Sequence, residues 1–236
     1  MPTAPTSTSE KPLASQEDAF IDPFYERIRR DPIPPDSGIH AVILAKSAED
    51  SETARNIAVS LAKLTENSGR PFEVKVVHYG EIGLAEAMRQ GHENAVHPLV
   101  LITTAIQPWT TEHLDPMLKA IDVCDHVFGD RRSPLLTRLR NWIARTPWKL
   151  LFSIPGLDVD TPCRLHRLAA IRSIPLQSRS RFVNVELLVK ATYLTQVVGN
   201  VRVPDLKAAA IPLNRSDARL VFWRPTLPVS ESYSKS

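Results

Sequence analysis

The chain has 236 residues, of which 43% are hydrophobic and 23% are charged. This composition is typical of a soluble globular protein with one α/β domain or two small domains. The longest stretch without a charged residue or a histidine, from Pro98 to Thr111, is shorter than the roughly 20 residues that cross a bilayer. Two cysteines, Cys124 and Cys163, cannot build a disulfide scaffold or a cysteine-only zinc site. Because the N-terminus also lacks the apolar core of a secretory signal, we expect a reduced, cytoplasmic protein.

Charge is unevenly distributed along the chain, whose formal net charge is +3. Residues 41–130 contain 7 Lys and Arg against 13 Asp and Glu, whereas residues 131–190 contain 12 against 3. A basic half of this kind attracts phosphates, anionic lipid or nucleic acid. Its aromatic residues do not alternate with the basic ones as they do in a base-stacking platform, so nucleic acid is not the expected partner.

The chain divides into three predicted parts. Residues 1–37 are expected to be a disordered segment or arm, because they are rich in Pro, Thr and Ser, and a short helix or docking arm is predicted over 18–30. Residues 38–204 are predicted to form an α/β domain. Residues 205–236 are predicted to be a C-terminal arm followed by a loose tail.

Short apolar runs alternate with amphipathic segments in the predicted domain. The runs predict strands over 39–45, 72–78, 99–103 and 125–129, and the amphipathic segments predict helices over 48–65, 83–91 and 110–122. This order predicts a right-handed βαβ array around a mostly parallel central sheet flanked by helices. Ligands of such sheets bind beyond the carboxyl ends of the strands, which here are the segments 45–46, 78–79, 103–105 and 129–132.

A series of short motifs follows the fourth predicted strand. Its members are Gly129 with Arg131 or Arg132, then Asp158, Asp160, Arg164, Leu165 and Arg167, then Glu186, Leu187, Leu188, Lys190 and Ala191, and finally Val201, Val203 and Pro204. In order and spacing this series resembles the second half of family 2 glycosyltransferases, particularly the polyprenyl-phosphate sugar transferases related to dolichol-phosphate mannose synthase. The resemblance implies the GT-A fold and a hexosyltransferase that moves a sugar from a nucleotide sugar to a polyprenyl phosphate.

The resemblance also implies a set of site residues. The implied substrate-binding residues are Glu49, His78, Thr103, Arg131, Arg132, Asp158, Arg164 and Arg167. Asp160 and Glu186 are the candidate catalytic residues, because either carboxylate could orient an acceptor or pair with Arg164 or Arg167. The alternative is that these acids form ion pairs and helix-start charges that hold the segment together.

The donor side of the sequence departs from the family pattern. The family's third strand ends in D-x-D, which binds the divalent metal of the donor, but Thr103 and Ala105 occupy these positions. Mg²⁺ and Mn²⁺ prefer carboxylate ligands, so no metal or other cofactor is expected here. At the first two strand ends, Glu49 remains of the family's P-x-x-N-E turn, and His78 stands where the family has an acid.

Two functional hypotheses follow, and the sequence leaves open whether the chain is an enzyme. The first is a catalytically degenerate glycosyltransferase-like protein, a pseudoenzyme, that binds a nucleotide sugar, a polyprenyl phosphate or a protein partner. The alternative is an active, metal-independent glycosyltransferase in which Asp122, Asp125, Arg131 or Arg132 compensates for the missing acids.

A basic amphipathic segment lies between Leu135 and Leu151. It combines four cations with two tryptophans and a leucine stripe, namely Arg138, Arg140, Arg145, Lys149, Trp142 and Trp148. Contact with an anionic membrane surface would place the protein peripherally at the inner membrane face. An ordinary amphipathic helix with a solvated arginine face explains the same pattern, so both interpretations stay open.

Overall fold

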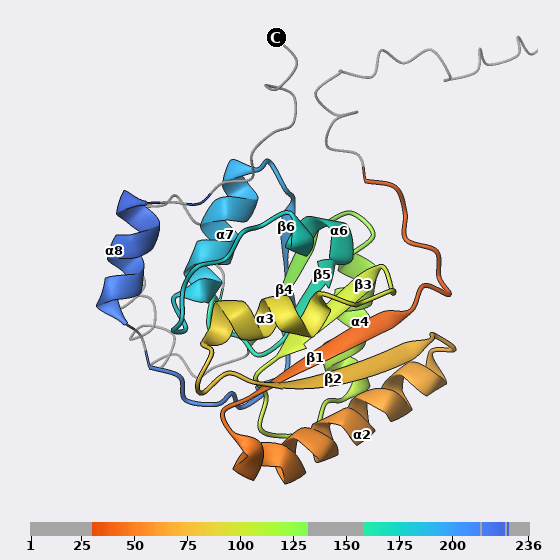
Figure 1. The fold of residues 1–236 in the computed structure, drawn as a ribbon. Coiled ribbons are helices and arrows are strands. Elements are labelled where there is room, and N and C mark those ends of the chain that lie inside the picture. Colours follow the sequence, from red (N-terminus) through yellow and green to blue (C-terminus); the bar gives the residue numbers. More distant parts are fainter. Residues whose placement is uncertain (1–29, 132–157, 213, 225, 227–236) are drawn as a thin grey trace, which may run out of the picture.

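A six-stranded sheet organises the part of the chain that the computed structural model describes, which is residues 30–131, 158–212, 214–224 and 226. The strand order is β2-β1-β3-β5-β4-β6 (Figure 1). The strands are β1 (Ile39–Ala45), β2 (Phe72–His78), β3 (Leu99–Thr103), β4 (His126–Arg131), β5 (Arg164–Arg167) and β6 (Val198–Val203). Of these six, β5 alone runs antiparallel to its neighbours. The predicted α/β fold with a mostly parallel sheet is therefore confirmed.

The central strands are the most apolar segments of the sequence. Every residue of β1 and of β3 is buried, as expected for strands that are covered on both faces. The parallel register pairs Ala45 with His78 and Ile43 with Thr103. The carboxyl ends of the first three strands consequently meet at one edge of the sheet, as predicted.

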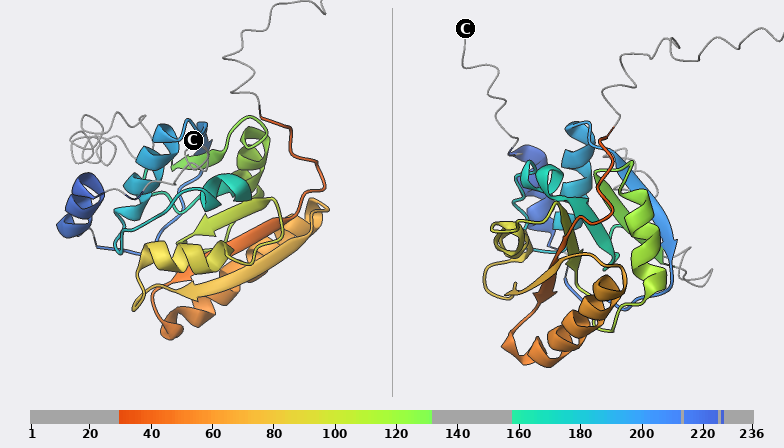
Figure 2. Two further views of the ribbon diagram at one scale, coloured as in Figure 1. Left: turned by 45° about the horizontal axis from the view of Figure 1, so that its top comes forward. Right: turned by 90° about the vertical axis from the view of Figure 1, so that its right-hand side faces the viewer.

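Helices cover both faces of the sheet (Figure 2). One face packs on α2 (Ser51–Asn67) and α4 (Thr111–Ala120), and a one-turn 3₁₀ helix, η2 (Ala48–Asp50), precedes α2. The other face packs on α3 (Leu84–His92), α6 (Leu168–Arg172), α7 (Val183–Tyr193) and α8 (Arg215–Trp223). Successive side chains of a strand point to opposite faces, so Ile39, Ala41 and Ile43 belong to the first core while Val42 and Leu44 belong to the second.

The three helices predicted for the first half are all present, with shifts of a few residues at their ends. The α2 helix forms because Ala54, Ile57, Leu61 and Thr65 recur at helical spacing and are buried together. Two other expected elements, the arm over 18–29 and the basic segment from Leu135 to Leu151, lie outside the described residues. Among the helices of the described residues, none is long and apolar enough to cross a membrane.

The chain after β6 returns to the middle of the sheet. Residues 205–209 run antiparallel beside the segment that follows β3, with a β-bridge between Ala105 and Ala208. Two backbone hydrogen bonds hold this arrangement, from Ile106 N to Lys207 O at 3.0 Å and from Ala209 N to Thr104 O at 2.8 Å. We call residues 205–209 the covering segment, because they lie over the carboxyl end of β3.

Candidate functional site

A pocket of about 250 Å³ opens at the edge where β3 and β4 end and β5 begins. Its lining residues come from six separate segments and are Leu84, Thr104, Arg131, Asp160, Arg164, Arg181, Asn184, Ala208, Ala209 and Ile211. Three of them are arginines, so we call this site the arginine pocket. It lies at the sheet edge where ligands of open α/β sheets bind.

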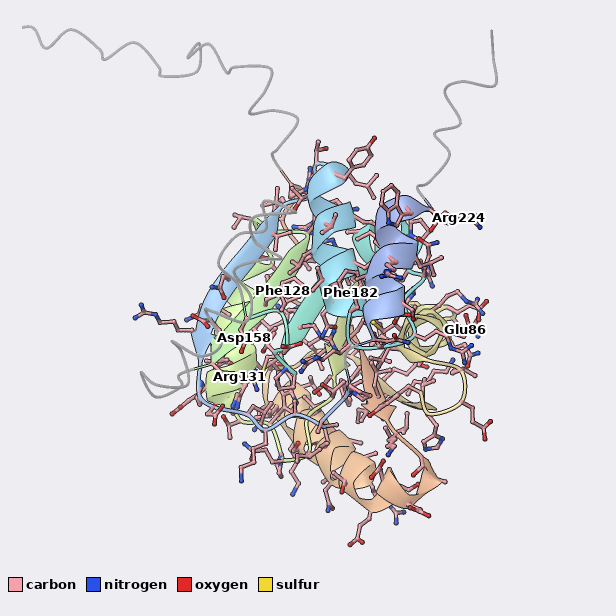
Figure 3. The ribbon with its side chains drawn as sticks, turned by 90° about the vertical axis from the view of Figure 1, so that its left-hand side faces the viewer. Glu86, Phe128, Arg131, Asp158, Phe182 and Arg224 are labelled. Carbon is pink, nitrogen blue, oxygen red and sulfur yellow. The ribbon has the colours of Figure 1, made fainter. Side chains whose placement is uncertain are left out.

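Arg131 enters the pocket from the last position of β4. Its Nε donates to Asp158 Oδ2 at 2.6 Å, and the two side chains are only 19% and 7% exposed. Figure 3 shows them next to each other at the end of β4. Two residues earlier, a Cβ added to Gly129 would lie 2.7 Å from Cys163 Cβ and 2.8 Å from Val203 Cγ2. A glycine is therefore required for β4 to pack closely against both neighbours, and this packing fixes the position of Arg131.

Arg164 is the most deeply buried charge of the pocket. It is 2% exposed, and its Nη1 donates to Asn184 Oδ1 at the start of α7. Its Nε has no hydrogen-bond partner among the described residues. Burial lowers the pKa of this guanidinium to about 10, because the charged form loses its solvation. The protein thus holds a buried cation with an unused donor against the pocket.

The rim of the pocket is formed by a weaker and more exposed ion pair. Arg181 Nη1 lies 3.9 Å from Asp160 Oδ2, and the two side chains are 43% and 33% exposed. Solvent screens such a pair, so it adds little stability. Its position at the mouth nevertheless places one more cation and one carboxylate beside Arg164.

Glu186, one of the two candidate catalytic residues, does not line the pocket. It is fully buried in α7 and accepts hydrogen bonds from Gln177 N and Ser178 N, both at 2.9 Å, and from Lys190 Nζ at 2.7 Å. Among the described residues, these two acids form the ion pairs Asp160–Arg181 and Glu186–Lys190, and Asp160 also acts on Arg164 electrostatically. These contacts give Glu186 a structural role, and a catalytic role for Asp160 stays a prediction.

Arg167 lies at the opposite edge of the sheet, three residues along β5 from Arg164. Its guanidinium donates to four backbone carbonyls, those of Cys124 at 3.0 Å, Asp31 at 2.8 Å, Ile121 at 3.0 Å and Asp122 at 2.9 Å. It therefore holds the end of α4 against the sheet and does not join the arginine pocket.

The remaining implied binding residues are not gathered in the pocket. Glu49 in η2 and His78 at the end of β2 are exposed and do not line it, and Arg132 lies outside the described residues. Thr103 is fully buried, and its Oγ1 accepts from Ala105 N at 3.0 Å. Four implied residues do come together, namely Arg131, Asp158, Asp160 and Arg164.

The donor-metal positions do not fit Mg²⁺ or Mn²⁺. The hydroxyl of Thr103 is engaged by the Ala105 amide, and Ala105 is 5% exposed beneath Ala208 of the covering segment. No group of three or more His, Cys, Asp or Glu residues that could hold a metal occurs in the described part of the chain. Asp125, a candidate substitute, is bound instead by Arg30 at 2.6 Å and by Val197 N at 2.7 Å.

Sequence reasoning missed more than half of the pocket lining. Arg181 and Asn184 precede and begin α7, and Ala208, Ala209 and Ile211 come from the chain after β6. The basic excess of residues 131–190 contains Arg181 and was a general signal for an anion site. No local pattern pointed to residues 208–211, because only the tertiary fold brings them back to β3.

A second hollow, of about 370 Å³, lies between α2 and the segment after β3. Its lining residues are Thr53, Asn56, Ile57, Val59, Ser60, Lys63, Ile106, Gln107 and Pro108. Lys63 is the one charged side chain in this lining. Binding sites are distinguished by several converging polar groups, so the arginine pocket is the stronger candidate despite its smaller volume.

No protein-family model and no curated protein matches this sequence. Among solved structures, the chain is similar to glucosyl-3-phosphoglycerate synthase from Mycobacterium tuberculosis in complex with Mn²⁺, UDP-glucose and glycerol 3-phosphate. The TM-score is 0.53 at 14% identity, over 79% of this chain and 78% of that one. The same enzyme with Mn²⁺, UDP and phosphoglyceric acid gives a TM-score of 0.54 at 13% identity, over 82% and 80%.

A third similar structure is described as a mycobacterial protein, with a TM-score of 0.57 at 16% identity over 79% of this chain and 72% of that one. At such identities the likeness concerns the fold. The nearer relationship to polyprenyl-phosphate sugar transferases stays a prediction. The chain has the GT-A fold of nucleotide-sugar glycosyltransferases, as the sequence predicted.

Proposed function

We propose that this chain is a glycosyltransferase-like protein that has lost sugar transfer and binds a phosphate-bearing ligand, such as a polyprenyl phosphate, in the arginine pocket. The observation that carries this proposal is the covering segment. Both positions where the family's metal-binding acids would stand are buried, and the bridge between Ala105 and Ala208 covers the second of them. A donor metal would need both new carboxylates and removal of this segment.

The chemistry of sugar transfer explains why this loss matters. The leaving diphosphate develops charge in the transition state, and a metal held by carboxylates normally neutralises it. Removing one preorganised charge-stabilising group costs roughly 10²- to 10³-fold in rate. Thr103 and Ala105 supply no charge, so both ligands of the D-x-D type are missing.

The similar solved structures support a ligand that contains phosphate. Those of glucosyl-3-phosphoglycerate synthase hold UDP-glucose and, as the second ligand, glycerol 3-phosphate or phosphoglyceric acid. In this chain the cations needed for a phosphate are present in Arg131, Arg164 and Arg181, whereas the metal ligands are absent from the described donor edge. The presence of these cations without metal ligands supports a phosphate-bearing ligand in the arginine pocket.

An active, metal-independent transferase is the second candidate. One observation favours it, because the three arginines of the pocket could neutralise a leaving diphosphate in place of a metal ion. This candidate requires that a nucleotide sugar reach the pocket past the covering segment.

Titration calorimetry of the full chain with UDP-glucose and GDP-mannose, with and without Mn²⁺, tests the proposal. We expect nucleotide-sugar affinity to be unchanged by Mn²⁺, and no sugar transfer to a polyprenyl phosphate in a parallel assay. A rise in affinity of about tenfold with Mn²⁺, equivalent to ~1.4 kcal/mol, would show a metal site elsewhere and contradict the proposal. Sugar transfer without metal would instead favour the second candidate.

A further inference from the structure

We propose that the arginine pocket is a binding site for one compact phosphate monoester group and that it does not accept a whole nucleotide sugar. This inference rests on the proposed function in one respect, namely that the ligand carries phosphate. It adds the group that is recognised, the residues that recognise it and the size limit.

The first argument is the incomplete state of Arg164. A buried guanidinium is costly unless an anion and enough acceptors surround it. Asn184 supplies one acceptor, and no carboxylate forms an ion pair with Arg164 among the described residues. Arg164 lines the pocket, while its unused Nε is shielded from solvent. A phosphate bound in the pocket would place an anion beside this buried guanidinium and compensate its charge.

The second argument is the balance of charge around the pocket. Arg131 is compensated by Asp158, and Asp205 also acts on it electrostatically. Asp160 lies at the rim near Arg181 and acts on Arg164 electrostatically, but no carboxylate among the described residues forms an ion pair with Arg164 in the interior. The interior of the pocket therefore favours an anion, while the carboxylates at its edge disfavour a ligand with many charges spread along its length.

The third argument is size. The volume of about 250 Å³ is below the range of roughly 300 to 1,000 Å³ that pockets for drug-sized ligands span. A phosphate with a few attached carbons fits such a space, whereas a nucleotide joined to a sugar by a diphosphate does not. The covering segment sets this limit, because Ala208 and Ala209 form part of the wall.

The phosphate group could belong to a small soluble ester or to the head group of a lipid. Both present the same oxygens to Arg164, and in both the rest of the molecule would leave past the half-exposed pair of Arg181 and Asp160. Glycerol 3-phosphate and inorganic phosphate probe the soluble source by calorimetry. Vesicles of phosphatidylcholine with phosphatidic acid, compared with phosphatidylcholine alone, probe the lipid source by co-sedimentation.

Three variants of the full chain test the assignment. Hydrogen bonds from charged donors contribute strongly to binding affinity. We therefore expect Arg164→Gln to weaken phosphate binding about a hundredfold, and Arg181→Gln, at a more exposed position, to weaken it about tenfold. Arg55→Gln is the matched control, because Arg55 is an exposed arginine of α2 on the other face of the sheet and should bind as the wild type does. If Arg164→Gln fails to fold, the Arg181→Gln variant, changed at a half-exposed position, tests the site instead.

Binding to either source that is weakened by the pocket variants and not by the control supports the site. No binding of any of the three phosphate probes, or equal weakening by Arg55→Gln, overturns it. Tighter binding of UDP-glucose than of glycerol 3-phosphate overturns the size limit. The outcomes are distinguishable. Sugar transfer with intact phosphate binding contradicts the loss of catalysis and leaves this site standing. No phosphate binding and no transfer contradicts this site and the phosphate ligand of the proposed function, and leaves the loss of catalysis standing.

Discussion

The protein has two clusters of buried charged side chains, and they differ in how completely their hydrogen-bonding groups are satisfied. In α7, Glu186 and Lys190 form an ion pair in which the carboxylate accepts three further bonds from Gln177 and Ser178 and the ammonium donates to Pro175 O, Gln177 and Thr226. In the arginine pocket, Arg164 is just as deeply buried but keeps an unused Nε.

The difference separates charges that hold the fold from charges that await a ligand. Fully bonded groups stabilise only as a set, since removing one member leaves the others buried and uncompensated. An incompletely bonded group costs stability in the ligand-free protein and recovers it on binding. Asp160 and Glu186 were both candidate catalytic acids in the sequence. The completeness of the hydrogen bonding around each of them distinguishes their surroundings in the structure.

The largest expected effect is on the complete cluster. Lys190→Met keeps the length of the side chain but leaves the Glu186 carboxylate buried without its cation, so we expect a loss of about 3–5 kcal/mol in the free energy of unfolding. Urea denaturation followed by circular dichroism measures it. Arg89→Met is the control, because the Arg89–Glu86 pair is solvent-exposed and its loss should leave the transition unchanged. A loss below ~1 kcal/mol for Lys190→Met would mean that the cluster does not hold the fold.

A row of buried histidines beside Arg164 gives the second prediction. His126 Nδ1 lies 2.9 Å from His166 Nδ1, so one of these two atoms must be unprotonated. Burial lowers the pKa of His166 well below its ordinary value, and the nearby charges of His126, Arg164 and His92 lower it further. Burial likewise lowers the pKa of His126.

The unfolded chain binds protons on these groups below about pH 6.5, and the folded chain does not. The free energy of unfolding should therefore be fully retained above about pH 6.5 and fall as the pH is lowered, by up to ~1.4 kcal/mol per pH unit for each histidine. In His166→Leu the loss between about pH 7.5 and 5 should be smaller by about 2 kcal/mol. The exposed His78, changed to Gln, should keep the wild-type dependence. A His166→Leu profile identical to that of the wild type would show that this residue does not titrate on unfolding.

The smallest expected effect concerns the incomplete cluster. Arg164→Met removes a buried charge that has no carboxylate partner among the described residues, so we expect stability to rise by less than ~1 kcal/mol in phosphate-free buffer. Thermal unfolding of both proteins measures the difference. Phosphate should then raise the melting temperature of the wild type and leave that of the variant unchanged. If Arg164→Met were several kcal/mol less stable than the wild type, Arg164 would be a structural charge like Lys190. The proposed difference between the two clusters would then be wrong.

Much of the fold could be read from the sequence, because its first half obeys simple patterns. The continuous apolar runs of β1 and β3 and the helical spacing in α2 gave boundaries that agree with the structure within a few residues. The strand β5 was missed, because Arg164-Leu165-His166-Arg167 has neither an apolar run nor alternation. Its strand conformation comes from hydrogen bonding to β3 on one side and β4 on the other, which is a tertiary effect.

The site was predictable only where a motif marked it. Arg131, Asp158, Asp160 and Arg164, which the family resemblance implied as site residues, lie together in the structure, and their binding and catalytic roles stay predictions. Arg167 belongs to the same motif, yet β5 carries it to the other edge of the sheet, where its bonds are to backbone carbonyls. The pocket wall from residues 208–211 depends on long-range contacts that carry no local signal.

The place of β5 between β3 and β4 has a consequence for how the protein is made. During synthesis β1, β2 and β3 can pair as soon as they emerge, but β3 keeps an open edge until Arg164–Arg167 has left the ribosome. That edge belongs to the strand Leu99–Thr103, in which every residue is apolar except its last. An unpaired apolar edge is prone to join other chains, so the nascent protein passes through an aggregation-sensitive stage that only the arrival of β5 ends.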